Sequence, residues 1–589
     1  MARVDPFDRP DVVAAASGGE EAVYRRRARR LGLSYTPHVV LGPNAYSDLS
    51  GIERGTFAMD AGEEGSAYLA PSEEIMPAIG HWLARHPTVR RRLAVATPTA
   101  IRAALRRAGE DGYASLALNR LERVDPRFSA RRTVTRRQAV IGGAAMMAIL
   151  AAMLVSPSTT IFLVDLVAAF FFLGVSMLRF AAAGRVPLRA SPAVAPADET
   201  ILPVYTILVP LLHEAHIVRQ IVAAFDRIDW PRDRLDIKLV VEEDDAATRF
   251  AATHAAPGTP YEIVIVPDGA GPRTKPMALQ YALTFARGDF VAIYDAEDLP
   301  HPGQLREAFE TFRRNDDRLA CLQAPIVIDN ARKNLITRLF AIEYSTVFDG
   351  ILPALAELRL PLPLGGTSNH FRRSAIEHVG GWDPFNVTED ADLGIRFARF
   401  GYRVATILLP TGEEAPAAFG PWLRQRSRWF KGWLQTWLVC LRQPLRFSRE
   451  IGFRQTCGFM LVGMGMIVSA VAHPLFLATP ILVAGDPLSM WNGDPLVAAI
   501  VGLNLFNLIA GYVAIAVLAR RTLALRRRGW AMTGVVWLPF YWLLMAIACV
   551  RAVIQLATRP HHWEKTPHVG RRQARPEGQP RFAASRQRS

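Results

Sequence analysis

Long apolar segments and short apolar runs alternate with polar stretches along this chain, and the two patterns predict different structures. A stretch of roughly 17–25 apolar residues is long enough to cross a bilayer as a helix. Five segments meet this length, two before the central region and three after it: 139–155, 161–178, 457–483, 496–518 and 531–557. The hydrophobic pattern therefore predicts a protein that is embedded in a membrane.

The first two apolar segments predict a transmembrane hairpin over residues 138–182. Arginines precede the first segment and follow the second, whereas the turn Ser156-Pro157-Ser158-Thr159 carries no basic residue. Because basic residues stay on the cytoplasmic side, both outer ends of the hairpin are expected there. The N-terminus is polar and charged, without a hydrophobic signal region, so residues 1–130 are also predicted to be cytoplasmic.

The three later apolar segments predict a transmembrane and interfacial region over residues 455–557. If each segment crosses once, the Arg-rich tail ends outside, against the positive-inside rule. We therefore expect part of 531–557 to be interfacial or re-entrant, or one Pro-interrupted segment to form a pair. Residues 558–589 are then cytoplasmic, and the polar stretch from Gly570 is expected to be disordered.

The central region, residues 200–415, shows the second pattern, in which short β-like runs alternate with helical stretches. The runs are 206–209, 237–241, 263–266 and 290–294. A strand followed by a helix, repeated, is typical of a parallel sheet in an α/β domain. Such a sheet binds its ligands at the carboxyl ends of its strands.

Two further regions flank the spans and the central domain. Residues 1–130 are predicted to form a small mixed α/β domain, with helices over 72–86 and 99–108 and a strand over 93–97. Residues 416–450 combine arginines with tryptophans at helical spacing, which predicts helices lying along the membrane surface.

Composition narrows the class of protein. Half of the 589 residues are hydrophobic, and the formal net charge is +15. The arginines gather beside the apolar segments and no nucleic-acid-binding module is visible, so the charge favours topology signals and anionic lipid as partner over nucleic acid. The four cysteines are far apart, as expected for small buried side chains in a reducing compartment rather than for a metal site.

Acidic clusters directly follow two of the predicted strands. Glu242-Glu243-Asp244-Asp245 comes after the second strand, and Asp295-Ala296-Glu297-Asp298 comes after the fourth. Positions i and i+2 of an extended chain share a face, so Asp295 and Glu297 can approach one cation, with Asp298 as the alternative second ligand. Few carboxylates around Mg²⁺ or Mn²⁺ leave room for phosphate oxygens. By itself, the Asp-x-Glu pattern also fits a solvated turn.

A third acidic stretch lies in a longer and more specific context. A Gly-rich segment at 363–372 and the loop Gly380-Gly381-Trp382-Asp383 precede Thr388-Glu389-Asp390. The basic-aromatic segment then contains Gln425-x-x-Arg428-Trp429, whose three residues share one face of a helix. An arginine binds a diphosphate with a bidentate fork, and an indole can stack on a sugar ring. Anchoring of a surface helix is a compatible interpretation of the same segment.

In this order, and between membrane segments, the motifs resemble those of membrane-embedded family-2 glycosyltransferases, the class that includes cellulose and β-glucan synthases. The resemblance implies a GT-A α/β fold, a UDP-sugar donor and inversion at the anomeric carbon. It implies that Asp390, beside Glu389, is the general base, because the family carries Thr-Glu-Asp at this place. The family's metal motif is Asp-x-Asp, and Glu297 departs from it.

The same resemblance assigns roles to the remaining motif residues. The first acidic cluster takes the place of acids that contact uracil and ribose, with Glu243 and Asp244 expected to be best placed. The lysine of the 274–280 loop is expected to face phosphate or base. The implied nucleotide-binding residues are Glu242, Glu243, Asp244, Lys275, Gln425 and Arg428, and the implied acceptor-binding residues are Thr388 and Trp429.

Two weaker resemblances concern the ends of the chain. Trp563, Lys565 and Thr566 follow the last apolar segment, where cellulose synthases carry a gating loop over the bound nucleotide. Residues 1–130 resemble the N-terminal domain of type II secretion ATPases, and some relatives of that domain bind cyclic di-GMP. Their nucleotide-binding repeat is not intact here, so cyclic di-GMP, a secretion partner and a plain docking role all stay open.

Together these interpretations predict an inverting, metal-dependent enzyme in a bacterial inner membrane, with its catalytic domain in the cytoplasm. It would polymerise a β-glucan-type polysaccharide from a UDP-sugar, UDP-glucose first, and pass the growing glycan out through its own helices. Transfer of a single sugar to a membrane lipid, and a catalytically dead scaffold or receptor, are the alternatives.

Overall fold

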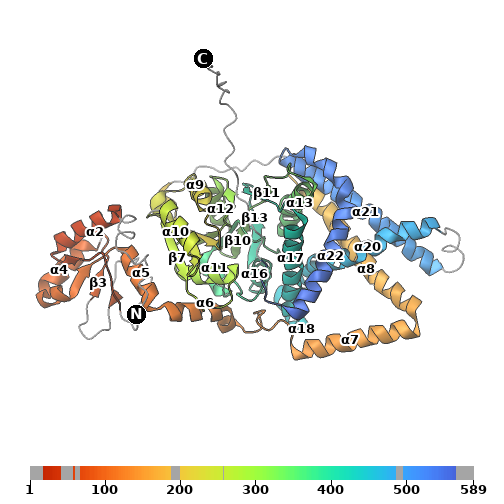
Figure 1. Cartoon of the computed structure of the whole chain (residues 1–589), viewed down its shortest axis with the longest axis horizontal. Coiled ribbons are helices and arrows are strands. Elements are labelled where there is room, and N and C mark those ends of the chain that lie inside the picture. Colours follow the sequence, from red (N-terminus) through yellow and green to blue (C-terminus); the bar gives the residue numbers. More distant parts are fainter. Residues whose placement is uncertain are drawn as a thin grey trace, which may run out of the picture.

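The computed structural model describes residues 18–41, 58–59, 67–73, 75–187, 199–256, 258–485 and 495–564. In this part of the chain an N-terminal module, an α/β domain and a group of long apolar helices lie in a row, from left to right in Figure 1. The predicted architecture, an α/β domain with long apolar helices and a small N-terminal α/β module, is confirmed.

A seven-stranded sheet forms the centre of the α/β domain. Its strand order is β13-β10-β12-β8-β5-β6-β7, and β12 runs antiparallel to both of its neighbours. The chain runs outward from β5 to β7 and then returns to β8 on the other side of β5, which leaves a crevice at the carboxyl ends of these strands. The strands are β5 (Tyr205–Leu211), β6 (Leu235–Glu242), β7 (Tyr261–Val266), β8 (Phe290–Ile293), β10 (Leu319–Gln323), β12 (Asn369–Arg372) and β13 (Arg403–Thr406).

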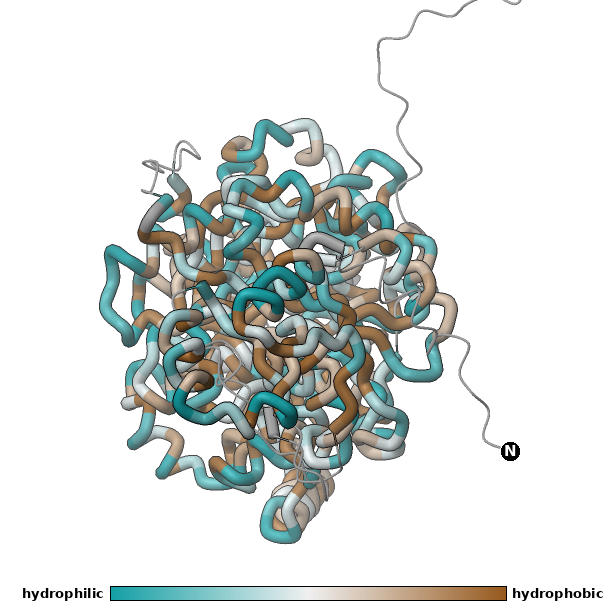
Figure 2. Tube along the Cα trace, turned by 90° about the vertical axis from the view of Figure 1, so that its left-hand side faces the viewer, coloured by the Kyte–Doolittle hydropathy of each residue, from teal (hydrophilic) through white to brown (hydrophobic). Residues whose placement is uncertain are grey.

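Helices cover both faces of this sheet, which explains why its central strands are nearly continuous apolar runs. Separate hydrophobic clusters lie on the two faces, and Figure 2 shows that many of the outer loops are hydrophilic. A small second sheet, β11-β14-β9, adjoins it and consists of β9 (Leu299–Pro300), β11 (Ile326–Ile328) and β14 (Thr411–Glu413). The helices of the domain are α9 (Val218–Phe225), α10 (Ala246–Ala255), α11 (Lys275–Leu283), α12 (Gln304–Arg313), α15 (Arg373–His378) and α16 (Glu389–Arg399).

The N-terminal module contains a four-stranded sheet in the order β1-β4-β3-β2. The helices and the strand expected at 72–86, 93–97 and 99–108 are present within a few residues. The elements are α2 (Gly18–Leu31), β1 (Ser34–Tyr35), β2 (Ala58–Met59), β3 (Ala67–Leu69), α4 (Met76–Arg85), η1 (Pro87–Arg92), β4 (Leu93–Val95), α5 (Pro98–Ala108) and α6 (Glu110–Val124).

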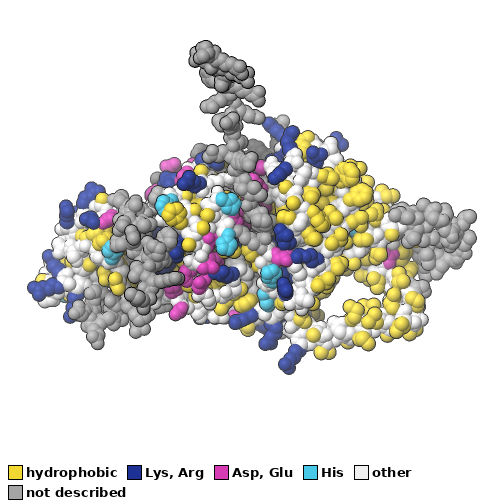
Figure 3. Space-filling view, viewed as in Figure 1, with side chains coloured by type: hydrophobic (Ala, Val, Ile, Leu, Met, Phe, Trp, Pro, Cys, Tyr) yellow, Lys and Arg dark blue, Asp and Glu magenta, His cyan; other side chains and the backbone are white. Residues whose placement is uncertain are grey.

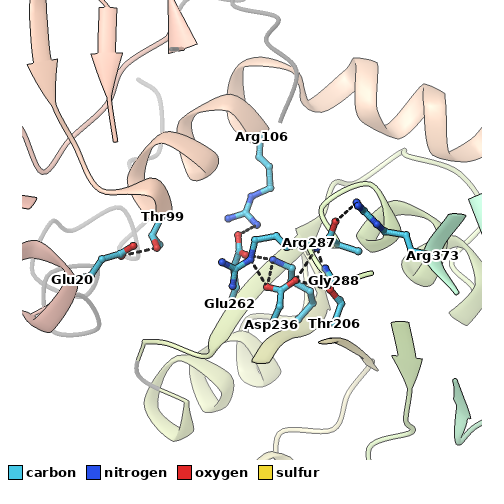
Figure 4. A network of polar contacts seen from close by, with 11 residues as sticks. Glu20, Thr99, Arg106, Thr206, Asp236, Glu262, Arg287, Gly288 and Arg373 are labelled. Atoms are coloured by element: carbon cyan, nitrogen blue, oxygen red, sulfur yellow. Dashed lines mark hydrogen bonds and ion pairs between the residues drawn. The ribbon is translucent and has the colours of Figure 1, made fainter. Parts of the chain in front are cut away.

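A chain of buried charges joins the N-terminal module to the α/β domain (Figure 4). Arg106 of α5 lies 2.5 Å from Glu262 of β7. Lys238 of β6 contacts both Glu262 and Asp236, and Asp236 also accepts a hydrogen bond from Arg287 at 2.9 Å. Lys238 and Asp236 are fully buried, so each depends on its partners, because a buried charge without a partner is strongly destabilising.

The loop Gly380-Gly381-Trp382-Asp383 attaches the segment after α6 to the α/β domain through hydrogen bonds. Asp383 accepts hydrogen bonds from Ser129 Oγ at 3.1 Å and Ala130 N at 2.5 Å, just after α6. Gln280 of α11 hydrogen-bonds to Gly380 O and Trp382 N, both at 2.9 Å. A side chain on Gly381, whose φ is +69°, would meet Gln280 at 2.0 Å, which explains the glycine pair.

Six helical segments in the described part of the chain are long and apolar enough to cross a membrane. Their hydrophobic side chains dominate the right-hand side of Figure 3. One of them, Leu335–Glu357, was not predicted from the sequence, and 72% of its most apolar window is buried inside the protein. The elements are α7 (Arg136–Val155), α8 (Pro157–Arg185), α13 (Leu335–Thr346), η4 (Val347–Ile351), α14 (Leu352–Glu357), α19 (Phe453–Phe459), η5 (Met460–Met464), α20 (Gly465–Gly485), α21 (Pro495–Leu525), η6 (Gly529–Trp537) and α22 (Leu538–Thr558).

The last apolar segment returns to the α/β domain at both of its ends. Before it, Arg528 lies 3.3 Å from Asp329. After it, His562 O accepts a hydrogen bond of 2.6 Å from Lys431. Lys431 lies on α17 (Phe419–Cys440), which is followed in the chain by α18 (Pro444–Ile451). Helix α22 packs along α17 between these points. Both ends therefore lie beside the α/β domain, and an interfacial or re-entrant part of 531–557, or a Pro-interrupted pair, stays a prediction.

The buried charge chain yields a stability prediction. Glu262→Ala leaves Lys238 and Arg106 without their shared carboxylate and should destabilise the protein by about 3 kcal/mol. The measurement is the apparent Tm of the detergent-purified full chain. Asp316→Asn, which removes an exposed partner of Arg403, is the control and should cost less than about 1 kcal/mol. Equal shifts for the two variants would contradict the prediction.

Candidate active site

A cavity of about 490 Å³ opens at the carboxyl ends of the strands and extends between the long helices. The acids that follow β8, the Gly-rich loop before β12 and the first turn of α16 all line it. The sequence-predicted residues on its wall are Glu242, Lys275, Asp295, Glu297, Thr388, Glu389, Asp390, Gln425, Arg428, Trp429 and Trp563.

Lys275 is the central cation of this site. It is the first residue of α11, where Thr274 caps the helix through its side chain. Its ammonium forms an ion pair with Asp295 and donates a hydrogen bond to Gly366 O at 2.6 Å. Burial lowers the pKa of Lys275, but Asp295 and Glu389 outweigh burial, so its pKa lies above the ordinary value. The lysine therefore stays charged among the carboxylates.

Glu389 and Asp390 begin α16 and face the same ammonium. Burial, reinforced by the charge of Asp390, raises the pKa of Glu389 to about 8. Burial also raises the pKa of Asp390. A side chain at Gly366 would approach Asp390 Oδ2 to 3.2 Å and Lys275 Nζ to 3.8 Å. Glycine at this position therefore keeps the space in front of the carboxylate open.

The second acidic cluster divides into two kinds of residue. Asp295 and Glu297 line the cavity. Asp298 is fully buried, and its Oδ2 accepts hydrogen bonds from Asp295 N at 2.7 Å and from Thr367 Oγ1. Burial raises the pKa of Asp298 well above the usual range. Asp298 thus shapes the turn that presents Asp295.

These residues fit a divalent cation that shares its shell with substrate. Among the described residues, no three His, Cys, Asp or Glu side chains converge closely enough to hold an ion by themselves. Asp295 and Glu297 offer two hard oxygen ligands on the cavity wall, and the buried Asp298 Oδ1 has no hydrogen-bond partner among the described residues. Mg²⁺ is commonly held by one or two carboxylates together with substrate phosphates.

The first acidic cluster is arranged differently from the prediction. Glu242, the last residue of β6, lines the cavity, and burial raises its pKa to about 7. Glu243 instead accepts a hydrogen bond from Asp268 N at 2.8 Å, and Asp244 forms an ion pair with Arg273. Glu242 is thus better placed than the two favoured residues, because side chains alternate between the faces of a strand. Nucleotide contacts by Glu243 and Asp244 stay a prediction.

Helix α17 supplies the opposite wall. The atoms Gln425 Oε1 and Arg428 Nε are buried and have no hydrogen-bond partner among the described residues. Arg428 donates one hydrogen bond, to Val387 O at 3.3 Å. Thr388 packs against Gly432, where a side chain would come within 2.2 Å of its Oγ1. The motif residues on this wall thus include buried polar atoms that have no partner among the described residues.

The segment after α22 reaches the same wall. The guanidinium carbon of Arg428 lies 5.7 Å from the centre of the Trp563 ring. Glu564 holds Arg551 of α22 through hydrogen bonds of 2.8 and 2.9 Å. Lys565 and Thr566 lie outside the described residues, so their predicted gating role stays a prediction.

Three cavity residues were missed by sequence reasoning. Glu413 ends β14 and lies near the second acidic cluster, and burial raises its pKa well above the usual range. Glu343 and Arg426 form an ion pair of 2.6 Å on the same wall. Arg426 stands inside the Gln-x-x-Arg-Trp motif, which was the available signal, whereas Glu343 lies in an apolar stretch with none.

Residues 290–558 match the family model described as Glycosyl transferase family group 2. This part of the chain is a family-2 glycosyltransferase domain. The match covers the second acidic cluster, the general-base candidate and the Gln-x-x-Arg-Trp helix, so the sequence resemblance and the geometry agree on the class of enzyme. Residues before 290 lie outside it, including the cluster at Glu242.

The chain is similar to curated proteins named as glycosyltransferases and cellulose synthases. A probable glycosyltransferase, YdaM of Bacillus subtilis, is 28% identical over 42% of this chain and 60% of its own length. The UDP-forming cellulose synthase catalytic subunits of Komagataeibacter xylinus and Xanthomonas axonopodis are 26% and 30% identical over 62% and 48% of this chain. The chain spans 47% and 39% of the length of these two relatives.

A solved structure also resembles the chain. A mannosyltransferase from Pyrobaculum calidifontis, in complex with GDP-Man and Mn²⁺, is 21% identical and covers 60% of this chain and 97% of its own, with a TM-score of 0.40.

The pKa directions predict a pH profile. The general-base candidate Asp390 acts in its ionised form, and burial raises its pKa, so kcat/KM should fall on the acid side at a pH above the ordinary range for a carboxyl group. Glu389→Gln removes the negative charge beside Asp390, which lowers the pKa of Asp390. The acidic limb of the profile should therefore move to lower pH. Initial rates of UDP release give the profile. A limb at about pH 4, the ordinary range for a carboxyl group, would contradict the prediction.

Proposed function

We propose that this protein is an inverting, metal-dependent glycosyltransferase that builds a β-linked polysaccharide from a UDP-sugar, with UDP-glucose as the first candidate. In this proposal the α/β domain faces the cytoplasm of a bacterial inner membrane and the product leaves through the protein's own helices. The division into the six regions predicted from the sequence belongs to the same proposal.

The observation that carries the proposal is the continuity of the cavity. Its wall runs from the carboxylates around Lys275, past Trp429, to Phe172 of α8, His473 of α20 and Trp542 of α22. A transferase that releases each product into water has no need of such an extension. A cavity that joins the reaction site to membrane helices suits an enzyme whose acceptor is also the chain that it exports.

The geometry supports a single displacement. Asp390 would take the proton of an acceptor hydroxyl while that oxygen forms its bond to the anomeric carbon. The bond from this carbon to the diphosphate breaks in the same step, and UDP leaves with its electron pair. A divalent cation held by Asp295 and Glu297 would supply charge neutralisation of the diphosphate when bound.

Other residues would bind and orient the donor. Arg428 can hold the diphosphate through its guanidinium, and Lys275 can contact the phosphates while it neutralises Asp295. Glu242 lies where a ribose or base would reach the end of β6. The relatives named as UDP-forming cellulose synthases favour uridine as the nucleotide.

The partner of the N-terminal module belongs to the proposal as well. Cyclic di-GMP, a secretion protein or a plain docking role all stay open for residues 1–130. The module's last helix packs on α11, which begins with Lys275, so a partner bound there would have a short route to the active site.

Purified full-length protein in lipid nanodiscs, given a panel of radiolabelled UDP-sugars with Mg²⁺ or Mn²⁺, tests the proposal. We expect one UDP-sugar to yield a long polymer that a linkage-specific hydrolase digests. Asp390→Asn should lower the rate at least about 100-fold, whereas Asp317→Asn, at a fully exposed site, should not change it.

Other outcomes separate the alternatives. A product that stays one sugar longer at all times would replace polymerisation with single transfer to a lipid. Unchanged polysaccharide in cells that carry Asp390→Asn would favour a scaffold without catalysis.

A further inference from the structure

A buried arginine lies inside the motif of α17, between residues that face the cavity. Arg426 follows Gln425 and precedes Arg428 and Trp429. Its side chain is only 3% exposed, although the helix is basic enough to suggest a row of lipid-facing arginines. A buried guanidinium is kept only where partners compensate its desolvation, so its partners indicate its role.

The guanidinium of Arg426 joins three helices. Its Nη1 donates a hydrogen bond to Glu343 Oε1 of α13 at 2.6 Å, and its Nη2 donates to the hydroxyl of Tyr541 of α22 at 3.2 Å. The Tyr541 hydroxyl in turn donates to Glu343 Oε2 at 2.8 Å and accepts from Trp422 Nε1 at 3.1 Å. Both oxygens of Glu343 are therefore occupied, and the guanidinium is fixed in direction.

The same guanidinium supports the indole of Trp429. Its carbon lies 4.3 Å from the centre of the Trp429 ring and 4.4 Å from that of Phe340. The ring of Tyr344 lies 6.0 Å from Trp429 on the same wall. Trp429 remains partly exposed and lines the cavity. Arg426 thus covers one side of the indole and leaves the ring in contact with the cavity.

We propose that Arg426, held by Glu343 and Tyr541, is a positioning residue that sets the plane of the Trp429 indole on which the acceptor sugar stacks. The inference rests on the proposed function, because it requires a glycan acceptor. An indole free to turn about its side-chain bonds would hold the sugar hydroxyl in many orientations toward Asp390. Small misplacements of a reacting group cost large factors in rate.

Tyr541 also connects Arg426 to helix α22. Tyr541 lies on α22, and the residues that follow α22 contact Lys431 and Arg428 of α17. The three hydrogen-bonded residues Glu343, Arg426 and Tyr541, here called the clamp, therefore connect the Trp429 indole to helix α22. The hydrogen bonds of the clamp connect α13, α17 and α22, so its loss should leave donor binding intact.

Steady-state kinetics of the full chain in nanodiscs test the proposal, with the UDP-sugar that the panel experiment selects and a soluble oligosaccharide acceptor. Tyr541→Phe and Arg426→Lys should raise the acceptor KM at least about tenfold and shorten the polymer. The KM for the UDP-sugar, and UDP-sugar hydrolysis without acceptor, should change less than about twofold. Lysine cannot replace the fork and the stacking of arginine.

A double-mutant cycle separates positioning from general stability. If Arg426 acts through the indole, Arg426→Lys should add almost nothing to the defect of Trp429→Ala. Arg424→Lys, two residues away on α17 and outside the cavity wall, is the matched control and should behave as wild type.

Three results would overturn the inference. These are additive defects in the cycle, an equal fall of all kinetic parameters in step with a lower Tm, and a rise in donor KM alone. Tyr541→Phe keeps the ring and its packing, so the acceptor KM of this variant tests the proposal even if Arg426→Lys does not fold. A wild-type protein without transfer activity would instead refute the proposed function.

Discussion

The ammonium group of Lys275 is the interaction on which the site depends. Asp295, Glu389 and Asp390 come from two separate segments of the domain, and their burial in one cavity would be unfavourable without a cation between them. Lys275 is rigidly presented, because it starts a capped helix and its ammonium also bonds to Gly366 O. One side chain thus holds Asp295 near the Glu389-Asp390 pair.

Helix α17 forms the wall opposite this cluster, and it both lines the cavity and packs against other helices. One part of α17 presents Gln425, Arg428 and Trp429 to the cavity, and another packs against α22 near the membrane segments. Arg426 connects the two parts, because its partners lie on α13 and α22. The basic and aromatic side chains of this helix therefore both line the cavity and pack against neighbouring helices.

The N-terminal module is integrated with the catalytic domain rather than tethered to it. Its charges continue the buried chain of Arg106, Glu262, Lys238 and Asp236 along the strands. The segment after α6 is held by Asp383, whose loop also carries the backbone that Gln280 of α11 fixes. The Trp-Asp loop, which the sequence offered as part of a catalytic signature, therefore has a structural task.

The sequence by itself determined the elements with a strong local signal. The four strands β5 to β8 of the central sheet, the hairpin of α7 and α8, and the acids at strand ends follow from apolar runs and their polar ends, since burial sets these patterns residue by residue. Only the tertiary structure decided that Glu242, and not Glu243 or Asp244, faces the cavity. It also revealed Glu343 and Glu413 in the wall and the contacts that Arg528 and His562 make on either side of the last apolar segment. Each of these depends on contacts between distant segments, and no local pattern records them.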